Sequence, residues 1–143
     1  YANYNIYKTK DSRYVSVGCL EKKFWTNLCN ALERTDLIDL IDCEENHPYL
    51  KEQLTLEFEK RTMAEWETYL KGKDTCVTPI LNFAEACDAE QTKANEMVLT
   101  VNDEELGEYK QIGFAMKLSK TPAQLSKRAP RLGEDNKEIL GED

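Results

Sequence analysis

The sequence predicts an α+β fold, with several helices packed on a small antiparallel sheet. Short segments that alternate apolar and polar residues, typical of strands, lie on either side of longer segments whose apolar residues recur every three or four positions, as in helices. With 143 residues, of which 41% are hydrophobic and 32% charged, the chain is long enough to bury a core of its own.

Strands and a helix alternate at the start of the chain. Residues 5–8 and 14–17 predict two short strands around a turn at residues 10–12. A helix is predicted over residues 21–33, because its apolar positions recur at helical spacing and form one face. These positions are Phe24, Trp25, Leu28, Cys29 and Leu32.

Two more helices are predicted in the middle of the chain. Pro48 suits the first turn of one of them. Its apolar face is formed by Leu50, Leu54 and Phe58, and its solvated residues are expected to be Lys51, Glu52, Glu57 and Lys60. The next helix begins at Thr62, which forms a capping box with Glu65, and Gly72 suits its end. Its buried stripe is expected to be Met63, Trp66 and Leu70.

The last third of the chain is predicted to add strands and a tail. Residues 76–81 are typical of a short apolar strand, and Asn82 with Glu85 predicts a second capping box at the start of a helix. Residues 97–101 and 109–116 are typical of strands. We expect residues 1–118 to form one small α+β domain. Residues 119–143 are rich in proline, glycine and charged residues, and we expect them to form a tail that is weakly ordered in isolation.

Composition excludes several classes of protein. The net charge of −8 argues against nucleic-acid binding, and no apolar run approaches the roughly 18 residues of a membrane span. The five cysteines form no C-x-x-C pair and the chain has one histidine, so we expect neither a zinc site nor a disulfide framework. Cys29 and Cys76 lie in apolar settings, which predicts buried free thiols and a reducing, intracellular compartment.

The most informative stretch is the strand-to-helix corner at residues 15–25. Gly18 and Cys19 are small, so another chain or a ligand can approach the backbone there. Glu21 follows at the mouth of the helix. A carboxylate in this place stabilises the helix dipole, and it can also face a cleft. Spacing alone leaves both roles open.

Other candidate groups have simpler explanations. Cys76 has no histidine in a suitable context to activate it, because His47 is expected in a loop just before Pro48, so core packing is its predicted role. Asp36, Asp39 and Asp42 are expected to form a solvated acidic face.

Three stretches, in order along the chain, resemble one known family. They are YKTKDSRYVSVGCLEKKF (residues 7–24), RTMAEW with DTCVTPIL (residues 61–66 and 74–81), and APRLGEDN with EIL (residues 129–136 and 138–140). Together they are similar to alpha-methylacyl-CoA racemases of the family III CoA-transferase superfamily. The resemblance implies that the chain is a fragment carrying the small domain. Residues 1–6 and 119–143 would connect it to a large Rossmann-like domain, and two subunits would interlock as rings in a homodimer.

The resemblance also assigns roles to residues. In the racemases, the glutamate matching Glu21 hydrogen-bonds the catalytic histidine of the partner subunit and orients it, and the residues matching Tyr4 and Leu20 line the acyl pocket. The histidine and aspartate bases of the racemases, and the aspartate nucleophile of the transferases, belong to the large domain. We therefore expect the isolated chain to be inactive. The sequence departs from the family pattern at Lys22, where a proline is usual, and at Ser12, where a glycine is usual.

The leading functional prediction is a racemase-type isomerase of fatty acid metabolism. It would invert the 2-methyl centre of branched fatty acyl-CoA thioesters by proton abstraction and return, without a metal or a cofactor other than the CoA of the substrate. Two alternatives stay open: a family III CoA-transferase that moves CoA between carboxylic acids, and a non-catalytic interaction module. The compartment stays open between mitochondrion, peroxisome and cytoplasm.

Overall fold

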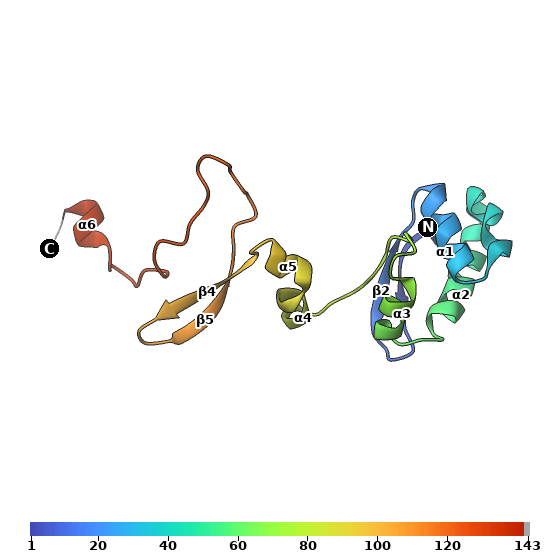
Figure 1. Cartoon of the computed structure of the whole chain (residues 1–143), viewed down its shortest axis with the longest axis horizontal. Coiled ribbons are helices and arrows are strands. Elements are labelled where there is room, and N and C mark those ends of the chain that lie inside the picture. Colours follow the sequence, from blue (N-terminus) through green and yellow to red (C-terminus); the bar gives the residue numbers. More distant parts are fainter. Residues whose placement is uncertain (142–143) are drawn as a thin grey trace. The chain divides into compact units, whose positions relative to one another are not determined.

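The computed structural model describes residues 1–141 and divides the chain into two compact units, Tyr1–Ile80 and Leu81–Asp143 (Figure 1). The sequence predicted that the small domain ends at residue 118 and that a tail follows. The boundary between the two compact units lies at residue 80, so residues 81–118 belong to the same unit as that tail. The return of residues 119–143 to a large domain stays a prediction.

A three-stranded antiparallel sheet forms the base of the first unit. Its strands are β1 (Tyr4–Lys8), β2 (Tyr14–Gly18) and β3 (Val77–Pro79), in the order β1-β2-β3. The central strand β2 pairs with both neighbours, and its last residue, Gly18, lies opposite Tyr4. Ser12 in the β1–β2 turn has a φ of 62°, so serine adopts the left-handed conformation that glycine adopts without strain.

Three helices and a run of short turns complete this unit. The helices are α1 (Lys22–Ala31), α2 (His47–Phe58) and α3 (Met63–Leu70). Between α1 and α2 lie three 3₁₀ turns, at Thr35–Leu37, Asp39–Asp42 and Glu44–Asn46. The predicted capping box is present, since the Thr62 hydroxyl accepts from the backbone N–H of Glu65 and the Glu65 carboxylate accepts from that of Thr62.

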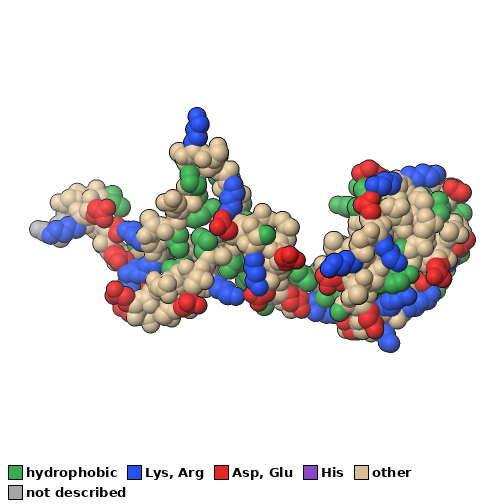
Figure 2. Space-filling view, viewed as in Figure 1, with side chains coloured by type: hydrophobic (Ala, Val, Ile, Leu, Met, Phe, Trp, Pro, Cys, Tyr) green, Lys and Arg blue, Asp and Glu red, His purple; other side chains and the backbone are tan. Residues whose placement is uncertain are grey.

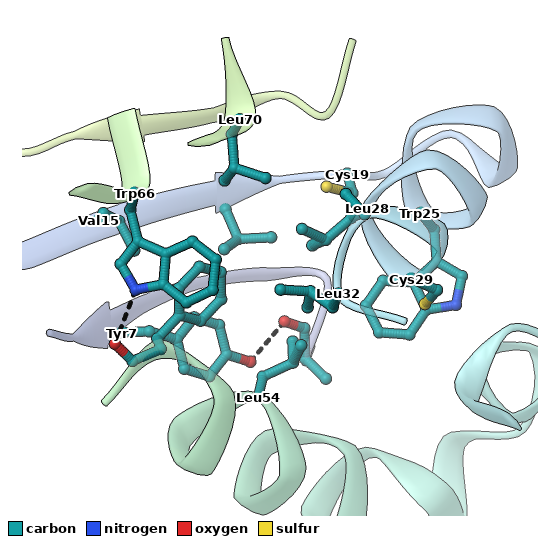
Figure 3. Packing of buried hydrophobic residues seen from close by; sticks show 14 of the residues in the cluster. Tyr7, Val15, Cys19, Trp25, Leu28, Cys29, Leu32, Leu54, Trp66 and Leu70 are labelled. Atoms are coloured by element: carbon teal, nitrogen blue, oxygen red, sulfur yellow. Dashed lines mark hydrogen bonds between the residues drawn. The ribbon is translucent and has the colours of Figure 1, made fainter. Parts of the chain in front are cut away.

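The helices cover one face of the sheet and leave the other open. Figure 3 shows Tyr7 and Val15 from the strands meeting Trp66 and Leu54 from the helices in one buried cluster. The polar atoms of the large rings are satisfied inside it: the Tyr7 hydroxyl donates to the carbonyl of Ala2 at 2.6 Å, and Trp66 Nε1 donates to the carbonyl of Phe58 at 2.8 Å. The predicted apolar faces of the three helices are confirmed.

Glu57 is the exception among the side chains predicted to be solvated. It is buried, and its carboxylate accepts hydrogen bonds from Arg34 and Lys60. The helical spacing explains its position, because residue 57 lies seven positions after Leu50 and so returns to the apolar face of α2. Burial is tolerated since two cations compensate the charge.

The second unit contains a hairpin, short helices and the tail. Helices α4 (Phe83–Asp88) and α5 (Glu90–Ala94) precede the antiparallel strands β4 (Val98–Asp103) and β5 (Gly107–Ile112), and α6 (Asn136–Leu140) follows in the tail. Ion pairs join the tail to the hairpin turn: Arg128 lies 3.0 Å from the Asp103 carboxylate and also binds Glu134 at 2.7 Å. A tail predicted to be weakly ordered in isolation is thus anchored to its own hairpin. None of the helices formed by residues 1–141 is both long and apolar enough to cross a bilayer.

Candidate functional site

Glu21 is the N-cap residue of α1, one position before the helix that it was predicted to open. Its backbone is extended, with φ −80° and ψ 138°, and its carbonyl accepts from the N–H groups of Phe24 and Trp25. Its side chain, however, makes no capping hydrogen bond, in contrast to Thr62 and Asn82 at the starts of α3 and α4. The helix therefore does not use the Glu21 carboxylate, which is exposed.

The corner that carries Glu21 is fixed by four hydrogen bonds. The N–H of Gly18 donates to the carbonyl of Cys76 at 3.0 Å, and the N–H of Cys19 donates to that of Asn3 at 2.8 Å. The Asn3 side-chain amide donates back to the Cys19 carbonyl at 2.9 Å, and the Cys19 thiol donates to the carbonyl of Thr75 at 2.8 Å. Because Asn3, Cys19 and Thr75 are buried, the three bonds that Cys19 makes are shielded from water, and all four bonds hold the residues just before Glu21 in place.

The two lysines next to Glu21 bind other carboxylates. Lys22 lies 2.6 Å from Asp42, and Lys23 lies 2.6 Å from Asp74. These hydrogen bonds raise the pKa of both lysines. Within residues 1–141, the Glu21 carboxylate makes no capping bond and no ion pair, and its charge only adds to the effect of Asp74 in raising the pKa of Lys23, so its oxygens can still accept a hydrogen bond from another group.

A hollow of about 490 Å³ lies on the open face of the sheet, beside this corner. It is lined by Tyr4, Asn5, Ile6, Ser16, Val17, Gly18 and Cys76. Tyr4 and Ile6 are 61% and 57% exposed, because they alternate with the buried Tyr7 along β1 and so face away from the helices. Of the three predicted site residues, Tyr4 lines the hollow. Leu20 and Glu21 follow Gly18 in the chain and are exposed, but they are not part of the lining.

Cys76 is exposed and lines the hollow, so the prediction that it is a buried core residue is wrong. The reason is the loop before β3, in which Asp74 and Cys76 have φ values of 52° and 48°. In this left-handed backbone geometry, the side chains of Asp74 and Cys76 point in other directions than they would in a regular strand. Thr75 between them is buried instead. The alternation of β1 could have indicated Ile6 as a lining residue, whereas no local signal marked Cys76.

His47 and the three aspartates have local partners. His47 is the first residue of α2, where its Nδ1 accepts from the N–H of Ala2 at 3.1 Å. Asp36 binds Arg34, and Asp39 and Asp42 face Lys22, which confirms a solvated acidic face.

Within the described residues, no three His, Cys, Asp or Glu side chains form a group that could hold a metal ion. Figure 2 shows acidic and basic side chains interspersed over the visible faces of both units.

Comparison with known proteins decides the family. The family model of CoA-transferase family III matches residues 1–136. The chain belongs to CoA-transferase family III. It is 34% identical over 142 residues to alpha-methylacyl-CoA racemase of Mus musculus, an alignment that covers 97% of this chain and 36% of that protein. It is 26% identical over 147 residues to succinyl-CoA:glutarate CoA-transferase of the same species, covering 97% of this chain and 33% of the relative.

Solved structures agree on the fold of this family III chain. The orthorhombic form of Rv3272 from M. tuberculosis superimposes with a TM-score of 0.77 at 20% identity, covering 93% of this chain and 39% of that one. The predicted α+β class, with helices on a small antiparallel sheet, is therefore confirmed. The chain spans little more than a third of the length of the proteins that it matches.

Proposed function

We propose that the chain is the small-domain part of a racemase-type isomerase, which inverts the 2-methyl centre of branched fatty acyl-CoA thioesters by proton abstraction and return. The observation that carries the proposal is the Glu21 carboxylate. It stands at a corner fixed by four hydrogen bonds, makes no capping bond in its own helix and forms no ion pair with the neighbouring lysines, which bind Asp42 and Asp74. A carboxylate held in this way is suited to receive an N–H from a group on another domain or subunit.

Removal of a proton next to a thioester and its return to the opposite face require a base on each side of the carbon. The only histidine of the chain accepts a backbone N–H through Nδ1 and packs against the Tyr1 ring, 4.9 Å between ring centres. The two bases are therefore assigned to the rest of the protein. Glu21 would bind the ring N–H of a histidine base, fix its orientation and stabilise its imidazolium form after it has taken the proton.

The acyl part of the substrate is assigned to the open face of the sheet. Tyr4 and Leu20 are large, exposed side chains on either side of the corner, at 61% and 63% exposure. Their burial against an acyl chain would be favourable by the hydrophobic effect. In this proposal the rest of the active site comes from the protein's own large domain and from a second subunit, and CoA enters as part of the substrate.

A CoA-transferase is the second candidate. The similarity to succinyl-CoA:glutarate CoA-transferase over 97% of the chain favours it, since a fixed corner beside an apolar hollow could serve either reaction. The gene's sequence upstream of Tyr1 separates the two: a histidine and aspartate pair supports the isomerase, and a single nucleophilic aspartate supports the transferase. Under the third hypothesis, a non-catalytic interaction module, neither activity is expected.

The test uses the full-length protein encoded by the gene. It is incubated with a 2-methylacyl-CoA in deuterated water, and both the exchange of the α-proton and the configuration of the product are measured. We expect exchange with inversion, and no transfer of CoA to added succinate or glutarate. Transfer without exchange would overturn the isomerase in favour of the transferase, and the absence of both activities would support the interaction module.

A further inference from the structure

Gly18 is one of the residues that line the hollow, and its missing side chain leaves space there. It is the last residue of β2 and pairs with Tyr4 across the sheet, and both residues line the hollow. The exposed Tyr4 ring does not close the space over Gly18, since Tyr4 keeps 61% of its surface. In the loop just before β3, the carbonyl of Cys76 accepts the Gly18 N–H at 3.0 Å. Strands β1 and β2 and the loop before β3 thus all contribute to the hollow around Gly18.

The fold gives no reason for glycine at this position. Four of the six glycines have positive φ, namely Gly72, Gly107, Gly133 and Gly141, and a Cβ at Gly113 would come within 2.4 Å of the Glu96 carbonyl oxygen. Gly18 has neither constraint. An added Cβ would meet only the Cys76 carbonyl oxygen, at 3.7 Å, which is an ordinary contact distance. Because glycine weakens a strand relative to alanine, its presence here has a cost without a structural gain.

The chemistry of the lining defines what the space can accept. None of its lining residues is charged, and Ser16 supplies a hydroxyl on the open face of the sheet. The Ser16 hydroxyl already exchanges a hydrogen bond with the Thr78 hydroxyl at 2.9 Å. A volume of about 490 Å³ lies within the range of small-molecule sites. The hollow is therefore suited to an uncharged, mainly apolar group and not to the phosphates of CoA.

We infer that Gly18 determines substrate specificity by setting the depth of the hollow that receives the acyl chain. The inference rests on the proposed function, in which Tyr4 contacts the acyl chain. Tyr4 lines the hollow and pairs with Gly18, three residues before Glu21. A side chain at position 18 would occupy part of the hollow, so bulky acyl chains would be excluded before small ones. The structure predicts that this change alters substrate choice without disturbing the sheet.

The experiment compares Gly18→Ala and Gly18→Val with the unsubstituted full-length protein. Turnover is measured on a series of 2-methylacyl-CoA thioesters of increasing chain length and branching. We expect kcat/KM for the bulkiest substrate to fall at least about tenfold relative to the smallest in Gly18→Val, and less in Gly18→Ala, as for other misfits in apolar pockets. The melting temperature should be unchanged or higher in Gly18→Ala. Ala64→Val on the exposed surface of α3, outside the hollow, is the matched control and should leave selectivity unchanged.

A second readout does not depend on turnover. Cys76 lines the hollow and Cys43 is exposed away from it, so their alkylation by iodoacetamide, followed by peptide mass spectrometry, gives a reporter and an internal control. The bulkiest 2-methylacyl-CoA should slow alkylation of Cys76 but not of Cys43, and this protection should be lost in Gly18→Val. Equal selectivity and equal protection in all variants would overturn the inference. Protection that depends on position 18 in a protein without isomerase activity would uphold it and refute the proposed function alone.

Discussion

Asn3 and Cys19 exchange two hydrogen bonds across the edge of the sheet. The Cys19 N–H donates to the Asn3 carbonyl at 2.8 Å, and the Asn3 side-chain amide donates to the Cys19 carbonyl at 2.9 Å. Both residues are buried, and Glu21 is only two positions beyond Cys19. This pair connects the start of the chain to the corner before α1, and the position of the candidate catalytic carboxylate depends on it.

Asn3→Ala should therefore destabilise the first unit. The substitution leaves the buried Cys19 carbonyl without its side-chain donor, which costs about 1–3 kcal/mol. Unfolding by urea, followed by tryptophan fluorescence, measures the loss, since Trp25 and Trp66 both belong to this unit. The control is Asn30→Ala at an exposed position of α1. Equal free energies of unfolding in the two variants would contradict the role of Asn3.

Glu21→Gln in the full-length protein should lower kcat far more than it raises KM. Glutamine keeps the size and one hydrogen-bonding oxygen but removes the charge that would stabilise an imidazolium. Losses at residues that orient a catalytic group typically reach about 10–100-fold. The melting temperature should not change, because the Glu21 side chain makes no capping bond.

The matched control for Glu21 is Glu52→Gln on the exposed face of α2, which should leave kcat intact. An unchanged kcat in Glu21→Gln would show that Glu21 acts only as a charge at the helix terminus. A large fall in its melting temperature would show that the role is structural.

The isolated chain of 143 residues should show neither racemase nor transferase turnover. The reason is that groups which act together in catalysis lose nearly all of their effect when one of them is removed, and the chain offers no pair of bases. Exchange of the α-proton of a 2-methylacyl-CoA in deuterated water is again the measurement. Exchange well above the background without protein would refute this prediction.

The five cysteines should fall into distinct reactivity classes. All are free thiols, so all should react in the unfolded, unreduced protein. In the folded chain Cys43 and Cys76 should react fast, whereas Cys19 and Cys29 should be nearly inert, because burial raises the pKa of both thiols to about 12. Iodoacetamide labelling with mass spectrometry tests the order. A protected Cys76 would contradict the open hollow.

Acid should break the ion pair between Arg128 and Glu134, which lies within the tail. The Arg128 guanidinium, by its hydrogen bond, lowers the pKa of the Glu134 carboxyl from 4.5 to about 2. A folded-state pKa below the unfolded value means that this stabilisation is fully present above the unfolded pKa and is lost as the pH falls towards about 2. Amide NMR signals of residues 128–134 should follow this loss, and Glu134→Gln should remove this contribution to their pH dependence. The exposed Glu138→Gln is the control.

Local patterns in the sequence were sufficient to predict most of the helices and strands. The apolar spacing of α1 and α2, the capping boxes at Thr62 and Asn82, and the alternation along β1 each follow from interactions among residues close in sequence. The family likewise followed from sequence, because its motifs are contiguous stretches. The same patterns could not show that the Glu21 side chain is left out of its helix cap, since Glu21 could also have been a first-turn residue.

By itself, the sequence determined the α+β class, the family and the place of the strand-to-helix corner, because periodicity, capping and contiguous motifs are properties of short segments. Only the tertiary structure decided which side chains meet at that corner. Glu57 became buried because Arg34, 23 positions away, compensates its charge, and Cys76 became exposed because a loop with two left-handed residues turns it outward. The hollow exists because strand pairing brings together Tyr4 of β1, Gly18 of β2 and Cys76 of the loop before β3. Contacts of this kind depend on chain geometry at long range, which residue type and spacing do not encode.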